Sequence, residues 1–186
     1  IINRDHEVNQ MEIRIDDECS SIIARRQPTA SDLRLVMTVI KVNTDIERIG
    51  DEAAKIARQG IRLAEESASP TNYIEIRHIG SHVESMLRKA LDAFARLDLE
   101  LAVEVVKEDT DVDKEYGSAL RSLVTFMMED PRDIGSILDE IWALRSLERI
   151  GDHAANIAEH VVYLVRGQDV RHQKSIEEFI DKVGEH

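Results

Sequence analysis

The chain has 186 residues, of which 42% are hydrophobic, 33% are charged and 4% are aromatic. This composition argues against a disordered or membrane-spanning protein, and the small numbers of Pro and Gly favour a few long helices. A formal net charge of −13 argues against a nucleic-acid partner, and a single cysteine, Cys19, agrees with a reducing compartment.

Helical periodicity is nearly continuous and predicts five helices. Their approximate bounds are 1–26, 32–66, 73–96, 98–128 and 132–166. Prolines mark two of the helix ends, since Pro28 follows the first helix and Pro131 follows the fourth. Gly167 is expected to stop the fifth helix, and the polar residues 168–186 form either a short helix or a mobile tail.

The sequence Glu-Arg-Ile-Gly-Asp occurs twice, at 47–51 and again 101 residues later at 148–152. An upstream acidic segment at 5–9 has a counterpart at 109–113, and Pro28 corresponds to Pro131 at a similar offset. Three similar offsets in the same order indicate an internal duplication.

The duplication predicts an all-α fold of two tandem three-helix bundles, because one amphipathic helix cannot bury its apolar face alone. The first repeat covers 1–69, the second covers 70–167, and 168–186 form a C-terminal tail. The first repeat shows only two helices where the second has three. Since the chain also opens without an initiator Met, we expect about 33 or more further N-terminal residues in the natural protein, which are cleaved, deleted or disordered.

The repeated motif places two carboxylates on one helix face. Glu47 and Asp51 stand four residues apart, as do Glu148 and Asp152. Like charges at this spacing destabilise a helix by a few tenths of a kcal/mol, which a cation or a basic partner would reverse. One such pair is common on acidic helices and seldom binds metal, but its repetition favours a functional role.

A second polar pair precedes each motif: Asp5 with Asn9, and Asp109 with Asp113. Helices joined at the prolines run antiparallel, and the two pairs of each repeat lie at similar distances from the hinge. Four oxygen-bearing side chains can therefore converge in each repeat, a set that suits Mg, Mn or Fe. The predicted metal ligands are Asp5, Asn9, Glu47, Asp51, Asp109, Asp113, Glu148 and Asp152.

Other candidate groups are weaker. Glu75 and His78 have the spacing of a di-iron ligand pair, but the spacing occurs once and a solvated helix face is the favoured interpretation. We expect His153 and His160 at the surface, and Arg149 in a surface salt bridge. The sequence has no phosphate-binding glycine loop, nucleophile elbow or Cys/His zinc spacing, so it predicts no enzyme active site.

The two motifs at 47–51 and 148–152 resemble the paired Glu/Asp-x-x-x-Asp signatures of the PhoU family. The stretch Arg-Gln-Pro-Thr-Ala-Ser-Asp-Leu-Arg at 26–34 is similar to the family's hinge after its second helix, and 91–96 and 127–130 also fit. The resemblance covers essentially the whole chain. Asn9 stands where the family pattern favours Asp, so we expect a weaker first site.

The resemblance implies a cytoplasmic, non-enzymatic accessory protein of the phosphate-specific ABC transporter. It implies divalent or trivalent metal ions (Mg, Mn, Fe or Zn) at the carboxylate motifs. The implied partners are the ATPase subunit of the transporter and a membrane sensor histidine kinase, through which the phosphate-starvation response is repressed. A homodimer is also implied, with membrane association only through partners.

Two other functions stay open. A di-iron carboxylate oxidase or iron-storage protein of ferritin-like build would need two Glu-x-x-His helices in one four-helix core, and the sequence offers one. A purely structural bundle would leave the acidic pairs as solvated faces. If metal occupancy differs between the repeats, we expect the site around Glu148 and Asp152 to be fuller.

Overall fold

The structure, a computed structural model, describes residues 2–65 and 73–167, with side chains from residue 6 onward. Its helices are α1 (Ile2–Arg26), α2 (Ala30–Glu65), α3 (Ile74–Arg96), α4 (Leu99–Glu129) and α5 (Ile134–Arg166), and a short 3₁₀ turn, Pro131–Asp133, precedes α5. The all-α prediction is confirmed, and the predicted helix bounds agree closely. The predicted boundary between the repeats, at 69 and 70, and the predicted tail at 168–186 lie outside the described residues.

Local signals explain where the helices begin and end. Asp98 caps α4, because its side chain accepts a hydrogen bond from the Leu101 amide at 3.1 Å. Gly167 ends α5 in the left-handed conformation, with φ of 71°, and its amide donates to the Tyr163 carbonyl at 2.9 Å. The predicted stop at Gly167 is therefore correct.

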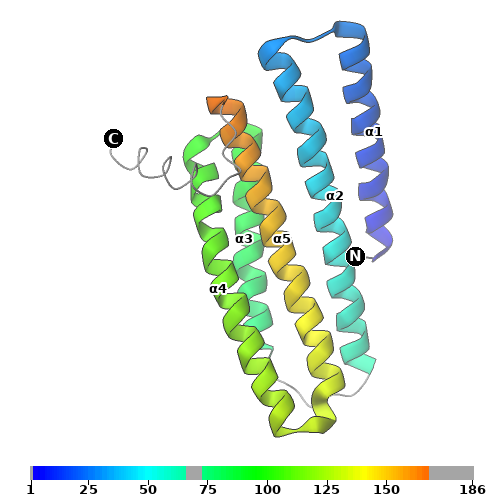
Figure 1. Ribbon diagram of the computed structural model, residues 1–186. Helices are drawn as coiled ribbons and strands as arrows, with labels where there is room; N and C mark the ends of the chain where they lie inside the picture. Colours follow the sequence, from blue (N-terminus) through cyan, green and yellow to red (C-terminus); the bar gives the residue numbers. More distant parts are fainter. Residues whose placement is uncertain (1, 66–72, 168–186) are drawn as a thin grey trace, which may run out of the picture.

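The helices pack as a three-helix bundle with a helical hairpin beside it (Figure 1). The bundle consists of α3, α4 and α5, while α1 packs against α2 and α2 packs against α5. The hinge between α1 and α2 lies at the opposite end of the molecule from the hinge between α4 and α5. Helix α5 is thus central, since it contacts α2, α3 and α4.

Apolar side chains fill the centre of the bundle. Each fully buried side chain of this kind stabilises the fold by roughly 1.5–3 kcal/mol relative to exposure. The largest ones, all nearly inaccessible to solvent, are Ile79, Val83, Met86, Val105, Val112, Ile137, Leu144, Ile157 and Val161. The core thus fixes α4 against α5, the two helices that carry the predicted metal ligands of the second repeat.

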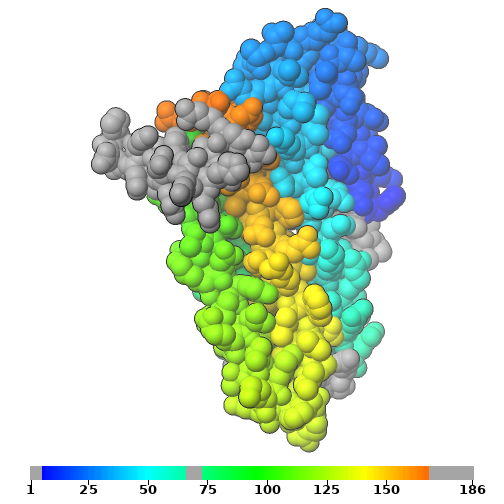
Figure 2. Space-filling model, viewed as in Figure 1, coloured from blue at the N-terminus to red at the C-terminus, as the bar shows by residue number. Residues whose placement is uncertain are grey.

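One face of the molecule leaves α5 exposed between α4 and α2 (Figure 2). Near the start of α5, Ile134, Leu138 and Trp142 are spaced four residues apart and are all exposed. Apolar side chains gathered in this way on a surface are typical of a contact with another protein.

None of the helices described here has a stretch both long and apolar enough for a membrane span.

Candidate metal centre

Three carboxylates from α4 and α5 meet in the second repeat. One oxygen each from Asp113, Glu148 and Asp152 lie within 4.8 Å of one another. Oxygen ligands bind hard cations at about 2.0–2.6 Å, so one ion could contact all three. The predicted convergence of these side chains is therefore present in the structure.

Asp109, the fourth predicted ligand of this repeat, is not among the three residues whose oxygens meet, but it lies near enough to feel the charges of Asp152 and Asp113. Burial and the neighbouring charges of Asp152 and Asp113 raise the pKa of Asp109 to about 6. A Cβ placed on Gly151 would lie 3.9 Å from Asp109 Oδ1 and 3.4 Å from Val112 Cγ1. The glycine of the motif therefore allows α4 to lie close to α5 at the height of the carboxylates.

Glu148 is the buried member of the cluster, and its environment favours a cation. Burial and the charge of Asp152 raise the pKa of Glu148, although Arg145 Nη1 donates to its Oε1 at 2.7 Å. The other oxygen, Oε2, is buried and has no hydrogen-bond partner among the described groups. An unsatisfied buried carboxylate oxygen is costly, and a metal ion would satisfy it. These residues therefore fit a cation.

The crowded carboxylates give the metal-free protein an expected pH dependence. The pKa of Asp109 in the folded protein, about 6, lies above the ordinary value of 3.8, so folding favours its protonated form. The resulting destabilisation is absent well below pH 4 and grows as the pH rises through about 6. In EDTA we expect Asp109→Asn to have the Tm of the wild type near pH 4 and a higher Tm at pH 7, as measured by circular dichroism.

The control for this comparison is Asp111→Asn, a substitution at an exposed carboxylate on the same helix. It should leave the Tm nearly unchanged at both pH values. A lower Tm for Asp109→Asn at pH 7 would contradict the expected repulsion.

The first repeat brings α1 and α2 together in a similar register. The side-chain amide of Asn43 donates to the Glu12 carbonyl at 2.9 Å and to Asp16 Oδ1 at 3.0 Å. These contacts fix the two helices as an antiparallel pair. One turn further along α2, Glu47 therefore stands at the height of Asn9 on α1.

The oxygen of the Asn9 side chain is available to this first cluster. Asn9 Oδ1 is buried without a hydrogen-bond partner among the described groups. The side chain of Asp5 lies outside the described residues, so its predicted role as a ligand stays a prediction. Glu47 and Asp51 are both half-buried on α2, as a site shared with α1 requires.

The expected surface position of His153 and His160 is wrong. Their side chains are 12% and 10% exposed, because both face α2 across the central interface. His153 Nδ1 lies 2.8 Å from Asp45 Oδ1, and His160 Nε2 lies 3.6 Å from Asp45 Oδ2. Burial opposes ionisation of Asp45, but the hydrogen bond from His153 and the nearby imidazole of His160 lower its pKa to about 2.

A second buried carboxylate, that of Glu52, forms an ion pair across the same α2–α5 interface. Glu52 is 3% exposed, and its Oε1 lies 2.9 Å from both Arg149 Nη1 and Lys55 Nζ. Arg149, which was expected in a surface salt bridge, thus pairs with a buried carboxylate and links α5 to α2.

Comparison of the repeats could not have revealed Asp45 and Glu52, because their counterparts are Ser146 and His153. A usable signal existed within α2 itself. Asp45 stands four residues before Ile49 and Glu52 stands three residues after it, so both carboxylates lie on the apolar face of α2. Charged residues on an apolar stripe indicate a buried polar contact.

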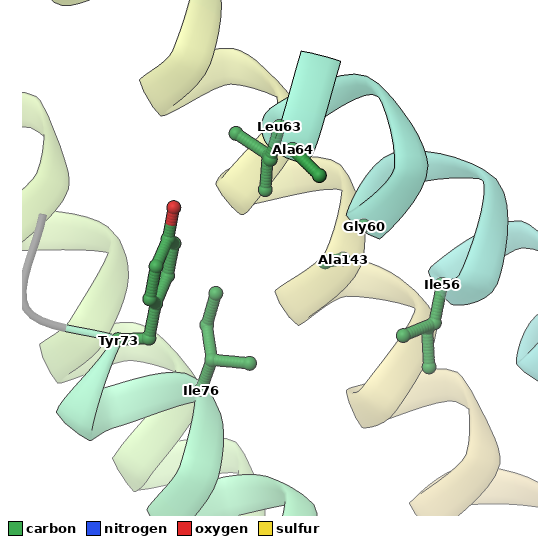
Figure 3. A pocket seen from close by; sticks show the side chains of 7 residues that line it. All are labelled: Ile56, Gly60, Leu63, Ala64, Tyr73, Ile76 and Ala143. Carbon is green, nitrogen blue, oxygen red and sulfur yellow. The ribbon is translucent and has the colours of Figure 1, made fainter. Parts of the chain in front are cut away.

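An apolar cavity of about 420 Å³ lies apart from both clusters, between α2, the start of α3, and α5 (Figure 3). Its lining residues are Ile56, Gly60, Leu63, Ala64, Tyr73, Ile76 and Ala143. No carboxylate or imidazole is among them, so this cavity offers no metal site.

Comparison with known proteins agrees with the fold and the motifs. The PhoU domain family matches residues 1–60 and 76–161. The chain is 63% identical over 168 residues to the phosphate-specific transport system accessory protein PhoU homolog of Pseudomonas aeruginosa, which is 90% of this chain and 69% of that protein. It is 48% identical over 172 residues to the phosphate-specific transport system accessory protein PhoU of Escherichia coli K12, covering 92% of this chain and 71% of that one.

Two crystal structures have the same architecture. PhoU from Pseudomonas aeruginosa gives a TM-score of 0.87 at 61% identity, covering 89% of this chain and 79% of that one. The phosphate transport system regulatory protein PhoU from Streptococcus pneumoniae gives a TM-score of 0.82 at 31% identity, covering 91% and 79%. The chain spans about two thirds of the length of the Pseudomonas aeruginosa and Pseudomonas putida relatives.

Proposed function

Because the chain belongs to the PhoU family, we propose that it is a regulatory accessory protein of phosphate transport whose carboxylate clusters bind metal ions. Its relatives are named as accessory proteins of the phosphate-specific transport system. The observation that carries the metal proposal is the cluster of Asp113, Glu148 and Asp152, with its buried and unpartnered Glu148 oxygen.

The proposed role is that of a non-enzymatic adaptor in the cytoplasm. Its proposed partners are the ATPase subunit of the phosphate ABC transporter, a sensor histidine kinase and a second copy of the chain. The exposed stripe of Ile134, Leu138 and Trp142 supports a role in protein contacts. Coupling these partners would hold the phosphate-starvation response off when phosphate is plentiful.

A bound cation would supply positive charge between α4 and α5, where four carboxylates otherwise repel one another. The protein's own groups then determine the shape of the site. Gly151 allows the close approach of α4, and Arg145 holds one Glu148 oxygen. The second Glu148 oxygen is buried without a hydrogen-bond partner among the described groups, so it could bind the ion.

The structure does not favour the ferritin-like alternative. Its chemistry needs Glu-x-x-His pairs inside a helical core. The side chain of His78 is 68% exposed, and its Nε2 lies 3.4 Å from Glu115 on α4, a residue that is not part of the carboxylate cluster. A purely structural role is also less favoured, because the repulsion among the carboxylates would then destabilise the fold with no bound cation to compensate for it.

A binding experiment with the full chain tests the adaptor proposal. The purified protein, with Mn²⁺ or with EDTA, is passed over the immobilised ATPase subunit and the cytoplasmic part of the sensor kinase. We expect retention with Mn²⁺ and at least tenfold weaker binding of the Glu148→Gln/Asp152→Asn variant. The exposed substitution Glu84→Gln serves as the control and should bind like the wild type. Failure to bind either partner under every metal and phosphate condition would contradict the proposal.

A further inference from the structure

Helix α2 carries a line of basic residues along one side. Arg34, Lys41, Arg48, Lys55 and Arg62 follow one another at intervals of seven residues. Seven residues are close to two helical turns, so the side chains share one side of α2 with a drift of about 20° per interval. Arg34 is half-buried and the other four are exposed. These four, Lys41, Arg48, Lys55 and Arg62, form a basic stripe about 32 Å long at 1.5 Å per residue.

The acidic residues of α2 are turned away from solvent over the same stretch. Between Lys41 and Arg62 every exposed charged residue of α2 is basic, and every acidic residue is buried or half-buried. Lys55 Nζ lies 2.9 Å from Glu52 Oε1, and Arg62 Nη1 lies 3.7 Å from Asp139 Oδ1. The side chains of these two carboxylates are only 3% and 13% exposed. The outer side of α2 is therefore positive, although the whole chain has a net charge of −13.

The two other members of the basic stripe are unpaired. Lys41 and Arg48 have no hydrogen bond or ion pair with any of the described residues. Single unpaired bases are common on protein surfaces, but here they belong to a regular series. Positive charges at intervals of seven residues match a second helix that carries carboxylates at the same interval, as in the flanking ion pairs of coiled coils.

Helix α5 adds an exposed aromatic residue on the same side. Arg149 Nη1 lies 2.9 Å from the Glu52 oxygen that also contacts Lys55, so α5 meets the basic stripe at this point. Trp142 stands seven residues before Arg149 on α5 and is 58% exposed. Figure 2 shows α2 and α5 beside each other on one face of the molecule. Trp is enriched among the residues that contribute most to binding at protein interfaces.

The basic stripe occurs in the first repeat alone. At the offset of 101 between the two motifs, its four positions correspond to Trp142, Arg149, Asn156 and Tyr163. Only one of these residues is basic. A partner that recognises the basic stripe must therefore lie along α2.

We propose that the basic stripe and Trp142 bind an acidic amphipathic helix of a protein partner. Carboxylates at intervals of seven residues would meet the basic stripe, and apolar side chains beside them would cover Trp142. The inference rests on the proposed adaptor function, because it assigns the surface that such a partner would use.

A single helix fits this surface better than a membrane or a nucleic acid. An extended polyanion is repelled by the net charge of −13. A helix touches only the narrow basic stripe, and salt screens the charges of the other faces beyond about 8 Å.

The test measures binding of a labelled acidic peptide to the full chain by fluorescence anisotropy in EDTA. The peptide has about 25 residues, enough to span the basic stripe as a helix, with Glu at every seventh position and Leu beside it. We expect saturable binding that weakens as salt is raised, and weaker binding of a peptide with the same residues in scrambled order. Lys41→Glu/Arg48→Glu should weaken binding at least about tenfold, since repulsion replaces attraction at two positions. Trp142→Ala should weaken it about threefold or more.

The matched control is Arg77→Glu/Lys107→Glu, which changes the net charge equally at exposed residues of α3 and α4. It should leave peptide binding nearly unchanged, and circular dichroism checks that every variant is folded. The proposal is overturned by an equal loss of binding in the control, by unchanged binding in Lys41→Glu/Arg48→Glu or Trp142→Ala, or by no binding of the wild type. Binding to anionic phosphatidylglycerol vesicles in place of the peptide would also overturn it. None of these outcomes affects retention of the wild type by the ATPase subunit or the kinase, which tests the adaptor proposal separately.

Discussion

The Glu148→Gln/Asp152→Asn variant is expected to lose metal binding in the second repeat by about 100-fold or more. Substitutions of groups that only support metal ligands already cost 10–100-fold, and these two residues are themselves predicted ligands. In EDTA the same variant should unfold at a Tm about 2–4 °C higher, since removing the repulsion gains about 1 kcal/mol. Elemental analysis and thermal unfolding measure the two effects.

The first repeat provides the matched comparison. Glu47→Gln/Asp51→Asn should remove only the metal of the first cluster, and Asn9→Asp should strengthen binding there by restoring a carboxylate. The wild type should hold more metal in the second cluster than in the first. Unchanged metal content in both double variants would contradict the metal proposal for both repeats.

The second large effect concerns the interface between α2 and α5, where Asp45→Ala should destabilise the protein by about 3 kcal/mol. The substitution leaves His153, His160 and Asn156 facing an interface with no acceptor, and losing one partner of a buried charged group typically costs 3–5 kcal/mol. Urea unfolding at pH 7 measures the change.

The lowered pKa of Asp45 predicts how its contribution to stability changes with pH. The folded-state pKa of Asp45, about 2, lies below its ordinary value of 3.8. Its stabilisation is therefore fully present above about pH 4 and is lost as the pH falls toward 2. Wild type and Asp45→Ala should converge in stability over that range.

An exposed pair provides the control for Asp45. Glu84 and Arg88 form an ion pair on the surface of α3, and Glu84→Ala should change the stability by no more than about 0.5–1 kcal/mol. Equal effects of Asp45→Ala and Glu84→Ala would show that the buried contacts do not stabilise the interface.

The helices and the second carboxylate cluster could be predicted because their signals are local. Apolar periodicity, the two hinge prolines and Gly167 determine the helix ends. Once two helices form a hairpin at Pro131, the spacing along each one places Asp113 opposite Glu148. The duplication stays an inference from the sequence, which the two separate matches to the same domain family support.

The interface contacts could not be predicted in the same way. Asp45 and His153 are 108 positions apart, and their pairing depends on how α2 lies against α5. Comparing the repeats finds residues that match, whereas these positions carry different residues in each copy. The pairing of His82 with Glu115 likewise depends on the register between α3 and α4, although the spacing of His78 and His82 was visible in the sequence.

The α2–α5 contacts also bear on the order in which the chain folds during synthesis. Hydrogen bonds and ion pairs within the hairpins join residues 15 to 37 positions apart, but those between α2 and α5 join residues 77 to 115 positions apart. Closing the longer loops costs more entropy, so we expect the hairpins to form first. Helix α2 leaves the ribosome well before α5, and until α5 arrives Asp45 and Glu52 face water. We expect these two charges to make the uncovered face of α2 less prone to aggregation than an entirely apolar face would be.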